Sequence, residues 1–565
     1  MSDALKRRAA AAVVFVATFA VFAPLVGAGF LNYDDDTQLV RNANWRGFTP
    51  ANVRWMVTDM RGIWSPLGWM SHAVDWHLWG LRPAGHHLTN VLLHALNALL
   101  LFMVILRLVP GAPVGAAVAA LAWSLHPLRV EPVAWVTERW DLLACAFYLL
   151  TVLAHLRLAA EEDGARRRRW YALSIAAAVL CVLSKAWGMT IPVVLLALDA
   201  WPLRRLSRAA WREKIPFVAI SAATAAIAVA AQKSAGALVG LGSHGVAERA
   251  AQAAYGLCFY VAKTAAPVGL SPMYPLRVDV GRDAALYAGC ALAVVAVTAA
   301  LVACRRRAPA ALAAWACFVV LVSPVLGVAQ SGPAAVADRY TYLAALPLSA
   351  LAAAGLARAG ARAAWGAAIV PAALGALAVP YQRVWMDSVS LWNRVVERAP
   401  DDYFARFNRG HARFTAGDLD GARADYAECD RLNPGYVAAA RRRAEQLATA
   451  ATARQDRGEW AAARKGLEEA VRLDPFLVAA WNNLGLARRA EGDGGGAVEA
   501  FGVAVRLDPS FAWAWANRAL VRLDRGDVRG AVADFEKALE VAPAGWPPRE
   551  AVERDAAELK RRLAP

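Results

Sequence analysis

The feature that most constrains this chain is a series of long apolar stretches that fills its first two thirds. About 20 consecutive apolar residues are needed to cross a bilayer as a helix. Eleven stretches are long enough, or have sufficiently apolar flanks, to do so. They lie at 9–33, 83–106, 108–128, 142–156, 170–184, 186–198, 215–232, 284–304, 308–337, 340–357 and 363–382. We therefore expect an all-α, polytopic membrane domain of about eleven spans.

The rest of the chain must be soluble, because 19% of all residues are charged although 58% are hydrophobic. Residues 1–387 carry 34 basic and 19 acidic side chains, whereas residues 388–565 carry 28 and 27. The net charge of +16 thus belongs to the membrane part, which argues against a nucleic-acid partner. The excess of Arg over Lys and the abundant Ala are typical of a GC-rich bacterial genome. The seven cysteines include no C-x-x-C pair, so neither a disulfide framework nor a thiolate metal site is expected.

Basic clusters between the apolar stretches predict how the chain crosses the membrane. Loops rich in Lys and Arg stay in the cytoplasm under the positive-inside rule. The clusters all fall on one side if the segment 249–266 lies at the membrane surface instead of crossing. The chain would then be an integral protein of the inner (cytoplasmic) membrane, with a cytoplasmic N-terminus and a periplasmic or extracellular C-terminal part. A span within 249–282 is the alternative, and it would put the C-terminal part in the cytoplasm.

The C-terminal part, 388–565, has an internal period of 34 residues. Glycine followed by Asp or Glu recurs at Gly417, Gly458, Gly492 and Gly526. This period is the signature of tetratricopeptide repeats, each a pair of helices. We expect about four repeats, the second of them lengthened, and a capping helix at 547–565. Such arrays form concave surfaces that bind other chains, and we assign Asn483 and Asn517, which share one repeat position, to peptide binding.

The loop after the first apolar stretch contains three adjacent carboxylates, Asp34, Asp35 and Asp36. Adjacent carboxylates repel one another unless a proton, a cation or a hydrogen-bond donor relieves them. The triplet is therefore either a solvated helix cap or part of a site, as a general base or as a ligand of a metal or phosphate-linked group. Several tryptophans follow in residues 45–79, which indicates that this loop lies on the bilayer.

Further ionisable residues stand at the predicted outer ends of the spans, where charge is costly and a functional site is the default interpretation. The alternative is a set of structural ion pairs. A polar stripe on the second span, which includes His94, favours interhelical hydrogen bonds. Carboxylates are suited to take a proton, and Arg or Lys to hold a phosphate. The residues at the other span ends are His126, Glu131, Glu138, Arg139, Asp141, Lys185, Asp338 and Arg339.

The order of these motifs is similar to that of a known family. The motifs lie at 32–35, 80–94, 126–141, 184–185 and 338–342, and the tetratricopeptide repeats follow. The chain resembles the transmembrane and tetratricopeptide-repeat O-mannosyltransferases that act on cadherins, and their bacterial relatives, which are GT-C glycosyltransferases. The resemblance implies that residues 1–387 are a GT-C-like catalytic domain. It also implies that an acid in the first outer loop serves catalysis and that a polyprenyl phosphate carries the sugar.

Resemblance and residues together predict transfer of a sugar, mannose in that family, from a polyprenyl-phosphate donor to a hydroxyl group. The acceptor is expected to be Ser or Thr of a protein, and the anomeric carbon is expected to invert. Asp34 or Asp35 would accept the hydroxyl proton. The donor phosphate would be stabilised by Arg139, Arg339 and Lys185. The acceptor or the base would be oriented by His126, Glu131, Glu138, His94 and Asp338.

The predicted partners are thus a lipid-linked sugar donor, the membrane and a protein acceptor held by the repeats. No cofactor is assigned, although the triplet Asp34, Asp35 and Asp36 offers ligands for a divalent cation. Two other functions are compatible with the sequence. One is a non-catalytic scaffold that assembles an envelope complex. The other is a transferase of the O-antigen-ligase type with a polyprenyl-diphosphate donor, which is disfavoured because that class has its large outer loop late among the spans.

Overall fold

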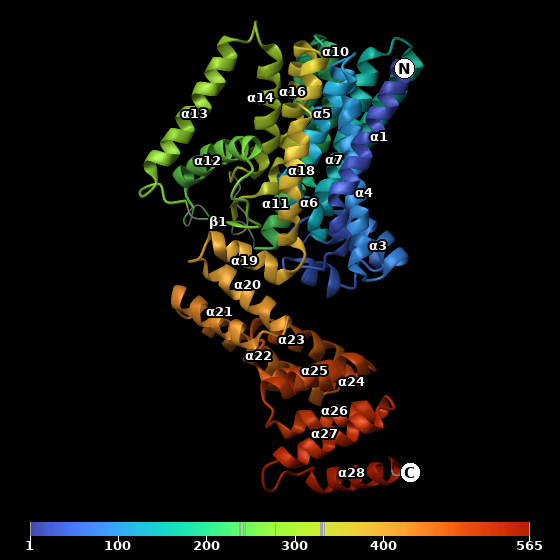
Figure 1. The fold of residues 1–565 in the computed structure, drawn as a ribbon, viewed down its shortest axis with the longest axis vertical. Helices are drawn as coiled ribbons and strands as arrows, with labels where there is room; N and C mark the ends of the chain where they lie inside the picture. The colour runs from blue at the N-terminus through green and yellow to red at the C-terminus, as the bar shows by residue number, and fades with distance from the viewer. Residues whose placement is uncertain are drawn as a thin grey trace. The chain divides into compact units, whose positions relative to one another are not determined.

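The computed structural model describes residues 2–60, 62–236, 239–240, 242, 244–276, 278–327, 332 and 334–563. The chain forms two compact units, Met1–Pro400 and Asp401–Pro565 (Figure 1). The sequence places the change of composition after residue 387. The helix α19 (Ser388–Arg398), which follows directly, packs within the first unit.

The first unit is built from helices, short helical turns (labelled η) and one small antiparallel strand pair, β1 with β2. Its elements up to residue 200 are α1 (Asp3–Phe22), η1 (Ala23–Gly27), η2 (Asp36–Val40), α2 (Pro50–Thr58), α3 (Pro66–Trp79), α4 (Pro83–Leu108), α5 (Pro113–Ser124), η3 (Pro127–Arg129), α6 (Val130–Ala134), η4 (Val136–Glu138), α7 (Arg139–Ala160), α8 (Gly164–Ser184), η5 (Ala186–Thr190) and α9 (Ile191–Ala200). The later elements are α10 (Arg208–Glu213), α11 (Ile215–Ser234), α12 (Val246–Ala265), β1 (Tyr274–Pro275), α13 (Ala284–Ala303), α14 (Pro309–Val322), η6 (Ser323–Val325), β2 (Ala334–Val336), η7 (Asp338–Tyr340), α15 (Thr341–Ala344), α16 (Leu346–Ala359), α17 (Ala361–Gly366), α18 (Ile369–Gln382), η8 (Arg383–Trp385) and α19.

Each of the eleven predicted spans includes a helix in the described part of the chain. The one predicted at 308–337 is too long, because its helical part ends at Val325 and Ala334–Val336 form β2; its residues 328–331 and 333 lie outside the described residues. Six segments are long and apolar enough to cross a membrane, namely Ala4–Gly27, Pro83–Leu108, Val136–Ala160, Arg208–Ser234, Ala284–Ala303 and Ala361–Trp385. The pair Asp338–Ala344 and Leu346–Ala359, bent by 56°, makes a seventh if it acts as one span. Four predicted spans remain. Three of them fall on shorter apolar helices, namely α5, η5 with α9, and α14 with η6. The fourth falls on α8, which begins with several arginines.

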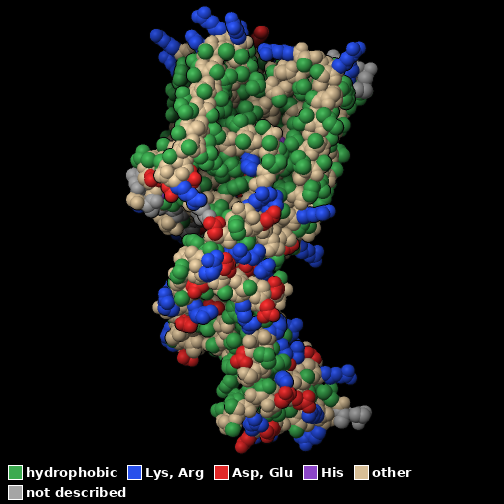
Figure 2. Space-filling view, turned by 60° about the vertical axis from the view of Figure 1, so that its left-hand side comes forward, with side chains coloured by type: hydrophobic (Ala, Val, Ile, Leu, Met, Phe, Trp, Pro, Cys, Tyr) green, Lys and Arg blue, Asp and Glu red, His purple; other side chains and the backbone are tan. Residues whose placement is uncertain are grey.

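The surface of the first unit also has the character of a membrane domain. Apolar side chains cover much of its flank in Figure 2. Leu292 on α13 and Ile369 on α18 are 70% and 71% exposed. The N-terminus, α10 and the turn between α13 and α14 lie at one end of the unit (Figure 1), and each carries basic residues. The assignment of these basic clusters to one side of a membrane requires such an arrangement.

The chain between α1 and α4 folds into a small helical subdomain. α2 and α3 pack around a core of Leu39, Trp45, Met56, Trp69, Ala73, Val136 and Trp140. Gly68 on α3 is needed there, because a Cβ at this position would lie 2.1 Å from the indole ring of Trp140. The interpretation of the loop's tryptophans as bilayer anchors is wrong for Trp45 and Trp69. Both are buried, because the loop is long enough to enclose an apolar core of its own.

The second unit has the predicted repeat architecture. Its helices form four pairs and a final helix within residues 401–563: α20 (Tyr403–Thr415) with α21 (Leu419–Leu432), α22 (Tyr436–Asp456) with α23 (Trp460–Leu473), α24 (Val478–Ala490) with α25 (Gly494–Leu507), α26 (Ala512–Asp524) with α27 (Val528–Val541), and α28 (Arg549–Leu563). The recurring alanines are fully buried, namely Ala422, Ala463, Ala497 and Ala531. The recurring glycine between paired helices has a positive φ, 90° at Gly417 and 83° at Gly492, a conformation that glycine adopts without steric cost. The extra residues of the second repeat lengthen α22.

Candidate functional site

Five charged side chains, which we call the outer cluster, meet in the first unit. The outer cluster consists of Glu131, Glu138, Asp141, Lys185 and Arg339, which come from three separate parts of the chain. Glu131 lies on α6, Glu138 ends η4, and Asp141 lies in the first turn of α7. Lys185 stands between α8 and η5 with an extended backbone (φ −162°, ψ 155°), so the helix ends just before it. Arg339 is the middle residue of η7.

Acids and bases alternate along the outer cluster. Arg339 binds Glu131 through its guanidinium, and its backbone N–H donates to Glu131 Oε2 at 2.8 Å. Arg339 Nε also lies 3.2 Å from Glu138 Oε1. Lys185 Nζ lies 2.6 Å from Glu138 Oε2 and 2.9 Å from Asp141 Oδ1. Glu138 therefore joins the two cations, and each cation is held between two carboxylates.

The cations are the members of the outer cluster that solvent reaches best. The side chains of Arg339 and Lys185 are 13% and 15% exposed, whereas that of Glu138 is 5% exposed and those of Glu131 and Asp141 are fully buried. Buried carboxylates are tolerated only with compensating charge and hydrogen bonds, so here they orient the two cations from behind. The cluster thus presents a fixed pair of cations, an arrangement that suits an anionic ligand.

Aromatic rings complete the surroundings of Arg339. Its guanidinium carbon lies 5.2 Å from the ring centroid of Trp135 and 4.8 Å from that of Tyr340. Contacts of this kind between a cation and an aromatic face are attractive. They restrict the guanidinium further, so its direction is set by two carboxylates and two rings.

Asp34 and Asp35, the two predicted catalytic acids, differ sharply in their surroundings. Asp35 is fully buried, and its carboxylate accepts the backbone N–H of Leu31 at 3.1 Å and both the N–H and the hydroxyl of Thr137 at 2.9 and 2.5 Å. Asp34 is exposed and has a φ of 78°. A left-handed backbone is uncommon for residues other than glycine and concentrates at functional sites. Asp35 therefore anchors the loop, and Asp34 is the acid that a substrate can reach.

Burial and the surrounding charges shift the pKa values of both carboxyl groups. Desolvation by the neighbouring protein raises the pKa of Asp34 to about 6, the carboxylates of Asp36 and Glu138 add to the rise, and Arg339 opposes it. Desolvation raises the pKa of Asp35 to about 7, although the hydrogen bonds from Thr137 and Leu31 lower it. Asp34 is thus mostly ionised at neutral pH and more basic than an ordinary aspartate. The charges of Glu138 and Arg339 affect the pKa of Asp34, so Asp34 interacts electrostatically with the outer cluster.

Arg139, predicted to hold the donor phosphate, makes its contacts elsewhere. It is fully buried, and its Nε donates to Asn90 Oδ1 at 2.8 Å. Its Nη2 donates to the carbonyl of His86 at 2.8 Å, and its Nη1 lies 2.6 Å from Asp75 Oδ2. These partners tie α7 to α3 and α4, and they leave Arg139 outside the outer cluster.

The two predicted orienting histidines also have protein partners. His94 is buried between the hydroxyl of Tyr342, 2.8 Å from its Nδ1, and the carbonyl of Ser124, 3.0 Å from its Nε2. These are the interhelical hydrogen bonds that the polar stripe predicts. His126 caps η3 through its Nδ1, and its Nε2 lies 3.1 Å from the carbonyl of Thr264 on α12.

Asp338, the remaining predicted orienting residue, accepts hydrogen bonds from two tyrosine hydroxyls, Tyr274 at 2.8 Å and Tyr381 at 3.3 Å. It is buried beside Arg339 and fixes the turn that carries this arginine. The sequence analysis named Asp141 among the ionisable residues at span ends but gave it no role. It did not name Trp187, whose indole N–H donates to Asp141 Oδ1 at 2.5 Å. A signal for Asp141 existed, because it stands one helical turn after Glu138; none existed for Trp187.

In the second unit, the predicted peptide-binding residues are half-buried and linked to neighbouring repeats. Asn483 Nδ2 donates to Thr452 Oγ1 at 3.0 Å, and Asn517 Nδ2 donates to Asn482 Oδ1 at 2.9 Å. A groove of 510 Å³ lies on other residues of this unit. It is lined by Arg423, Tyr426, Asp430, Val437, Arg441, Asp474, Phe476 and Leu507, among others.

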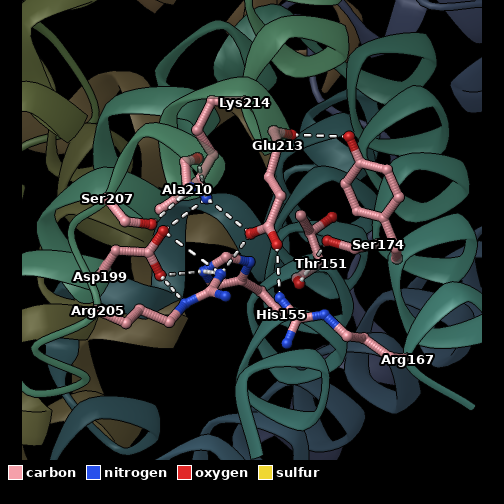
Figure 3. Close-up of polar contacts among 11 residues, drawn as sticks. Thr151, His155, Arg167, Ser174, Asp199, Arg205, Ser207, Ala210, Glu213 and Lys214 are labelled. Carbon is pink, nitrogen blue, oxygen red and sulfur yellow. Dashed lines mark hydrogen bonds and ion pairs between the residues drawn. The ribbon is translucent and has the colours of Figure 1, made fainter. Parts of the chain in front are cut away.

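A second group of charges, which we call the Asp199 cluster, includes a residue farther along α7 (Figure 3). His155 is its member on α7, about 20 Å along the helix axis from Asp141 at 1.5 Å per residue. Asp199 Oδ1 accepts from Arg205 Nε at 2.8 Å and lies 2.8 Å from His155 Nε2, and Asp199 Oδ2 accepts from Lys214 Nζ at 2.6 Å. Glu213 bridges Arg205 and Arg167 at 2.7 Å each. The members are therefore His155, Arg167, Asp199, Arg205, Glu213 and Lys214.

Apolar spans, a buried charge cluster at their ends and a repeat array define the class: a polytopic helical membrane protein with a tetratricopeptide-repeat unit. The tetratricopeptide repeat family model matches residues 381–437 and 448–511. Among solved structures, the tetratricopeptide domain of Sgt2 from Aspergillus fumigatus is 27% identical and covers 21% of this chain and 78% of that chain, with a TM-score of 0.20.

Sequence relatives point to a narrower group. The protein O-mannosyl-transferase Tmtc2 of Drosophila melanogaster is 37% identical over 179 residues, which is 29% of this chain and 19% of that protein. The human protein O-mannosyl-transferase TMTC4 is 28% identical over 184 residues, 28% of this chain and 25% of that protein. The chain thus matches a fifth to a quarter of the length of these relatives. The resemblance predicted from the motif order is confirmed over part of the chain, which is similar to the TMTC O-mannosyl-transferases.

Proposed function

We propose that this chain is a GT-C-type membrane glycosyltransferase. It would move a sugar, mannose by analogy with its relatives, from a polyprenyl-phosphate donor to a Ser or Thr hydroxyl of a protein. The observation that carries the proposal is the outer cluster, whose accessible members are the cations Arg339 and Lys185. The exposed carboxylate of Asp34 lies within electrostatic reach of this cluster. Two oriented cations and one accessible base are what an inverting sugar transfer from a phosphate requires.

In the proposed reaction, the acceptor hydroxyl oxygen bonds to the anomeric carbon while the bond from that carbon to the phosphate oxygen breaks. Asp34 accepts the hydroxyl proton, and the leaving polyprenyl phosphate keeps the bonding electrons. Arg339 and Lys185 stabilise the negative charge that develops on the phosphate. Asp35 does not react; it holds the loop so that Asp34 keeps its left-handed backbone. No metal takes part in this scheme.

An apolar cavity supports a lipid-linked donor. It has a volume of 160 Å³ and is lined by side chains of α4, α7, α9, α14 and α16, including Val104, Val194, Leu198, Leu346 and Leu351. α9 follows Lys185 after the η5 turn, and α16 follows Arg339 after the short helix α15. The helices that follow the two cations in the chain, α9 and α16, thus line an apolar space that suits a polyprenyl chain.

The repeats supply the proposed acceptor site. The 510 Å³ groove combines the rings of Tyr426 and Phe476 with side chains of both charges, namely Arg423, Arg441, Asp430 and Asp474. This mixed surface is suited to an extended peptide. The positive-inside rule supports placing the outer cluster and the repeats on the extracytoplasmic side of the inner membrane. We propose that the groove presents Ser- or Thr-containing chains to the membrane domain.

The test is sugar transfer in membranes that contain the full-length chain. Membranes receive labelled polyprenyl-phosphate mannose or its glucose counterpart, and label is followed into protein. We expect Asp34→Asn to slow transfer by about 10²- to 10⁴-fold, the usual worth of a general base, without lowering the melting temperature, because Asp34 is exposed. Asp59→Asn, in the same loop, serves as the matched acidic control. Asp35→Asn should lower the melting temperature, because Asp35 holds Thr137 and Leu31.

Each other outcome has a definite meaning. Equal transfer by the wild type and Asp34→Asn would place the catalytic base elsewhere. Absence of label with either donor, from a wild-type chain that is folded by its melting curve, would overturn the transferase and favour a non-catalytic scaffold. Transfer that requires a polyprenyl diphosphate would favour the ligase type.

A further inference from the structure

Three potential metal ligands converge in the subdomain between α1 and α4, apart from the outer cluster. His72 and Asp75 lie one turn apart on α3, and His86 lies in the first turn of α4. One ligand atom of each residue falls within 4.8 Å of the other two. The side chains of His72 and His86 are fully buried, and Asp75 is 2% exposed. In the described part of the chain, this group alone has such convergent ligand atoms.

The hydrogen bonds of His86 fix which of its nitrogens carries the proton. Its Nε2 lies 3.0 Å from the carbonyl of Gly80, and a carbonyl only accepts, so Nε2 is the donor. Its Nδ1 then carries a lone pair when the ring is neutral. That Nδ1 lies 3.3 Å from Asp75 Oδ2 and has no hydrogen bond of normal geometry among the described residues, while Oδ2 also lies 2.6 Å from Arg139 Nη1. Two acceptors thus face each other, which is unfavourable unless a cation or a proton lies between them.

His72 adds a second unexplained feature. Both of its ring nitrogens are buried without a hydrogen-bond partner in the described part of the chain. A buried polar atom without a partner costs about 1–3 kcal/mol, and such atoms in native structures call for an explanation. The His72 ring lies 5.9 Å from that of His86, centroid to centroid. A proton on His86 would explain the contact with Asp75, but it would leave His72 without a partner.

Asp75 is already oriented by neighbours that leave it able to bind a metal. Thr89 donates to Oδ1 at 2.9 Å, and Arg139 Nη1 lies 2.6 Å from Oδ2. Metal-bound carboxylates and histidines commonly have such outer partners, which set their direction. The Gly80 carbonyl does the same for His86. Each carboxylate oxygen has two lone pairs, so the contact with Arg139 leaves one on Oδ2 for a metal.

We infer that His72, Asp75 and His86 bind one divalent transition-metal ion of the zinc type. Two imidazoles and one carboxylate are a recurrent zinc ligand set. The ion supplies the partner that His72 lacks and separates the facing acceptors of His86 and Asp75. It joins α3 to α4 and keeps Asp75 in place for Arg139. The site is independent of the proposed transfer reaction.

The test is metal content of the full-length chain in detergent. The protein is treated with a chelator, incubated with Zn²⁺, desalted and analysed by elemental mass spectrometry. We expect one zinc per chain for the wild type, and at least a tenfold lower occupancy for His72→Ala and His86→Ala. His77→Ala is the matched control, because His77 is an exposed histidine on the same helix; it should keep its zinc. Zn²⁺ should raise the melting temperature of the wild type and of His77→Ala only.

A cysteine variant guards against loss of zinc through misfolding. His72→Cys replaces an imidazole by a thiolate, so its Co²⁺ complex should gain a sulfur-to-cobalt charge-transfer band that the wild-type complex lacks. That band would place residue 72 on the metal directly. A folded wild-type chain without stoichiometric zinc after this treatment would overturn the inference. So would a His72→Ala variant that retains full occupancy.

Discussion

The outer cluster and the Asp199 cluster are two groups of charges that both include residues of α7, and they differ in the balance of carboxylates and cations. In the Asp199 cluster an acid is the hub: Asp199 is fully buried and contacts Arg205, Lys214 and His155 (Figure 3). In the outer cluster three carboxylates, Glu131, Glu138 and Asp141, hold two cations. Solvent exposure does not separate the two sets of cations. Lys214 is 1% exposed, but Arg205 and Arg167 are 19% and 41% exposed, against 13% and 15% for Arg339 and Lys185.

This difference separates a structural ion-pair network from a binding site. A carboxylate saturated by cations has no capacity left for a ligand, and its neighbours gain nothing from moving. Two cations that are oriented by three buried carboxylates can bind an incoming anion at little cost in reorganisation. The Asp199 cluster therefore joins α7, α8, α9 and α10, and the outer cluster is the candidate for chemistry.

The largest expected effect is on stability, at the Asp199 cluster. Asp199→Ala leaves Lys214 buried without its acid, and breaking a buried ion pair from one side costs about 3–5 kcal/mol of unfolding free energy. Glu397→Gln removes one partner of an exposed pair with Arg394 and should cost at most about 1 kcal/mol. Melting curves in detergent measure both. A wild-type melting curve for Asp199→Ala would show that this cluster does not hold the helices together.

The next effect is on donor use, at the outer cluster. Lys185→Ala removes one charged contact to the donor phosphate. Such contacts contribute about 1.5–3 kcal/mol, so kcat/KM for the donor should fall by about 10- to 150-fold. Lys185→Arg, which keeps the charge, should recover part of the loss. Steady-state kinetics with varied donor concentration measure this, and an unchanged kcat/KM in Lys185→Ala would assign the cluster to structure alone.

The smallest effect is on the pH profile. Asp34 must be deprotonated to accept a proton, so transfer at low substrate concentration should rise with pH around an apparent pKa of about 6. The Asp36 carboxylate raises the pKa of Asp34. Asp36→Asn should therefore lower that pKa and move the rising limb of the profile to lower pH. A profile that stays in place, or moves to higher pH, would contradict the assignment of Asp34 as the base.

Parts of the candidate site were predictable from single residues, and others were not. An ionisable residue at the end of an apolar span is a strong signal, and it identified Glu131, Glu138, Lys185 and Arg339. The same signal also selected Arg139, which the structure places with Asp75 and His86. It could not separate Asp34 from Asp35, because adjacent residues of one type look alike in a sequence. The burial of Asp35 and its three hydrogen bonds, with the exposure of Asp34, distinguish the anchor from the accessible acid.

The sequence by itself determined that this protein has apolar spans followed by helical repeats. Both signals are local and periodic: a span needs only a run of apolar residues, and a repeat needs only its recurrence after 34 residues. The tertiary structure alone decided which charges pair. Glu131 and Arg339 are 208 positions apart, and their contact depends on how several helices pack, which no local pattern encodes. It also decided that the loop after the first span encloses its own core, because burial is a property of the packed chain.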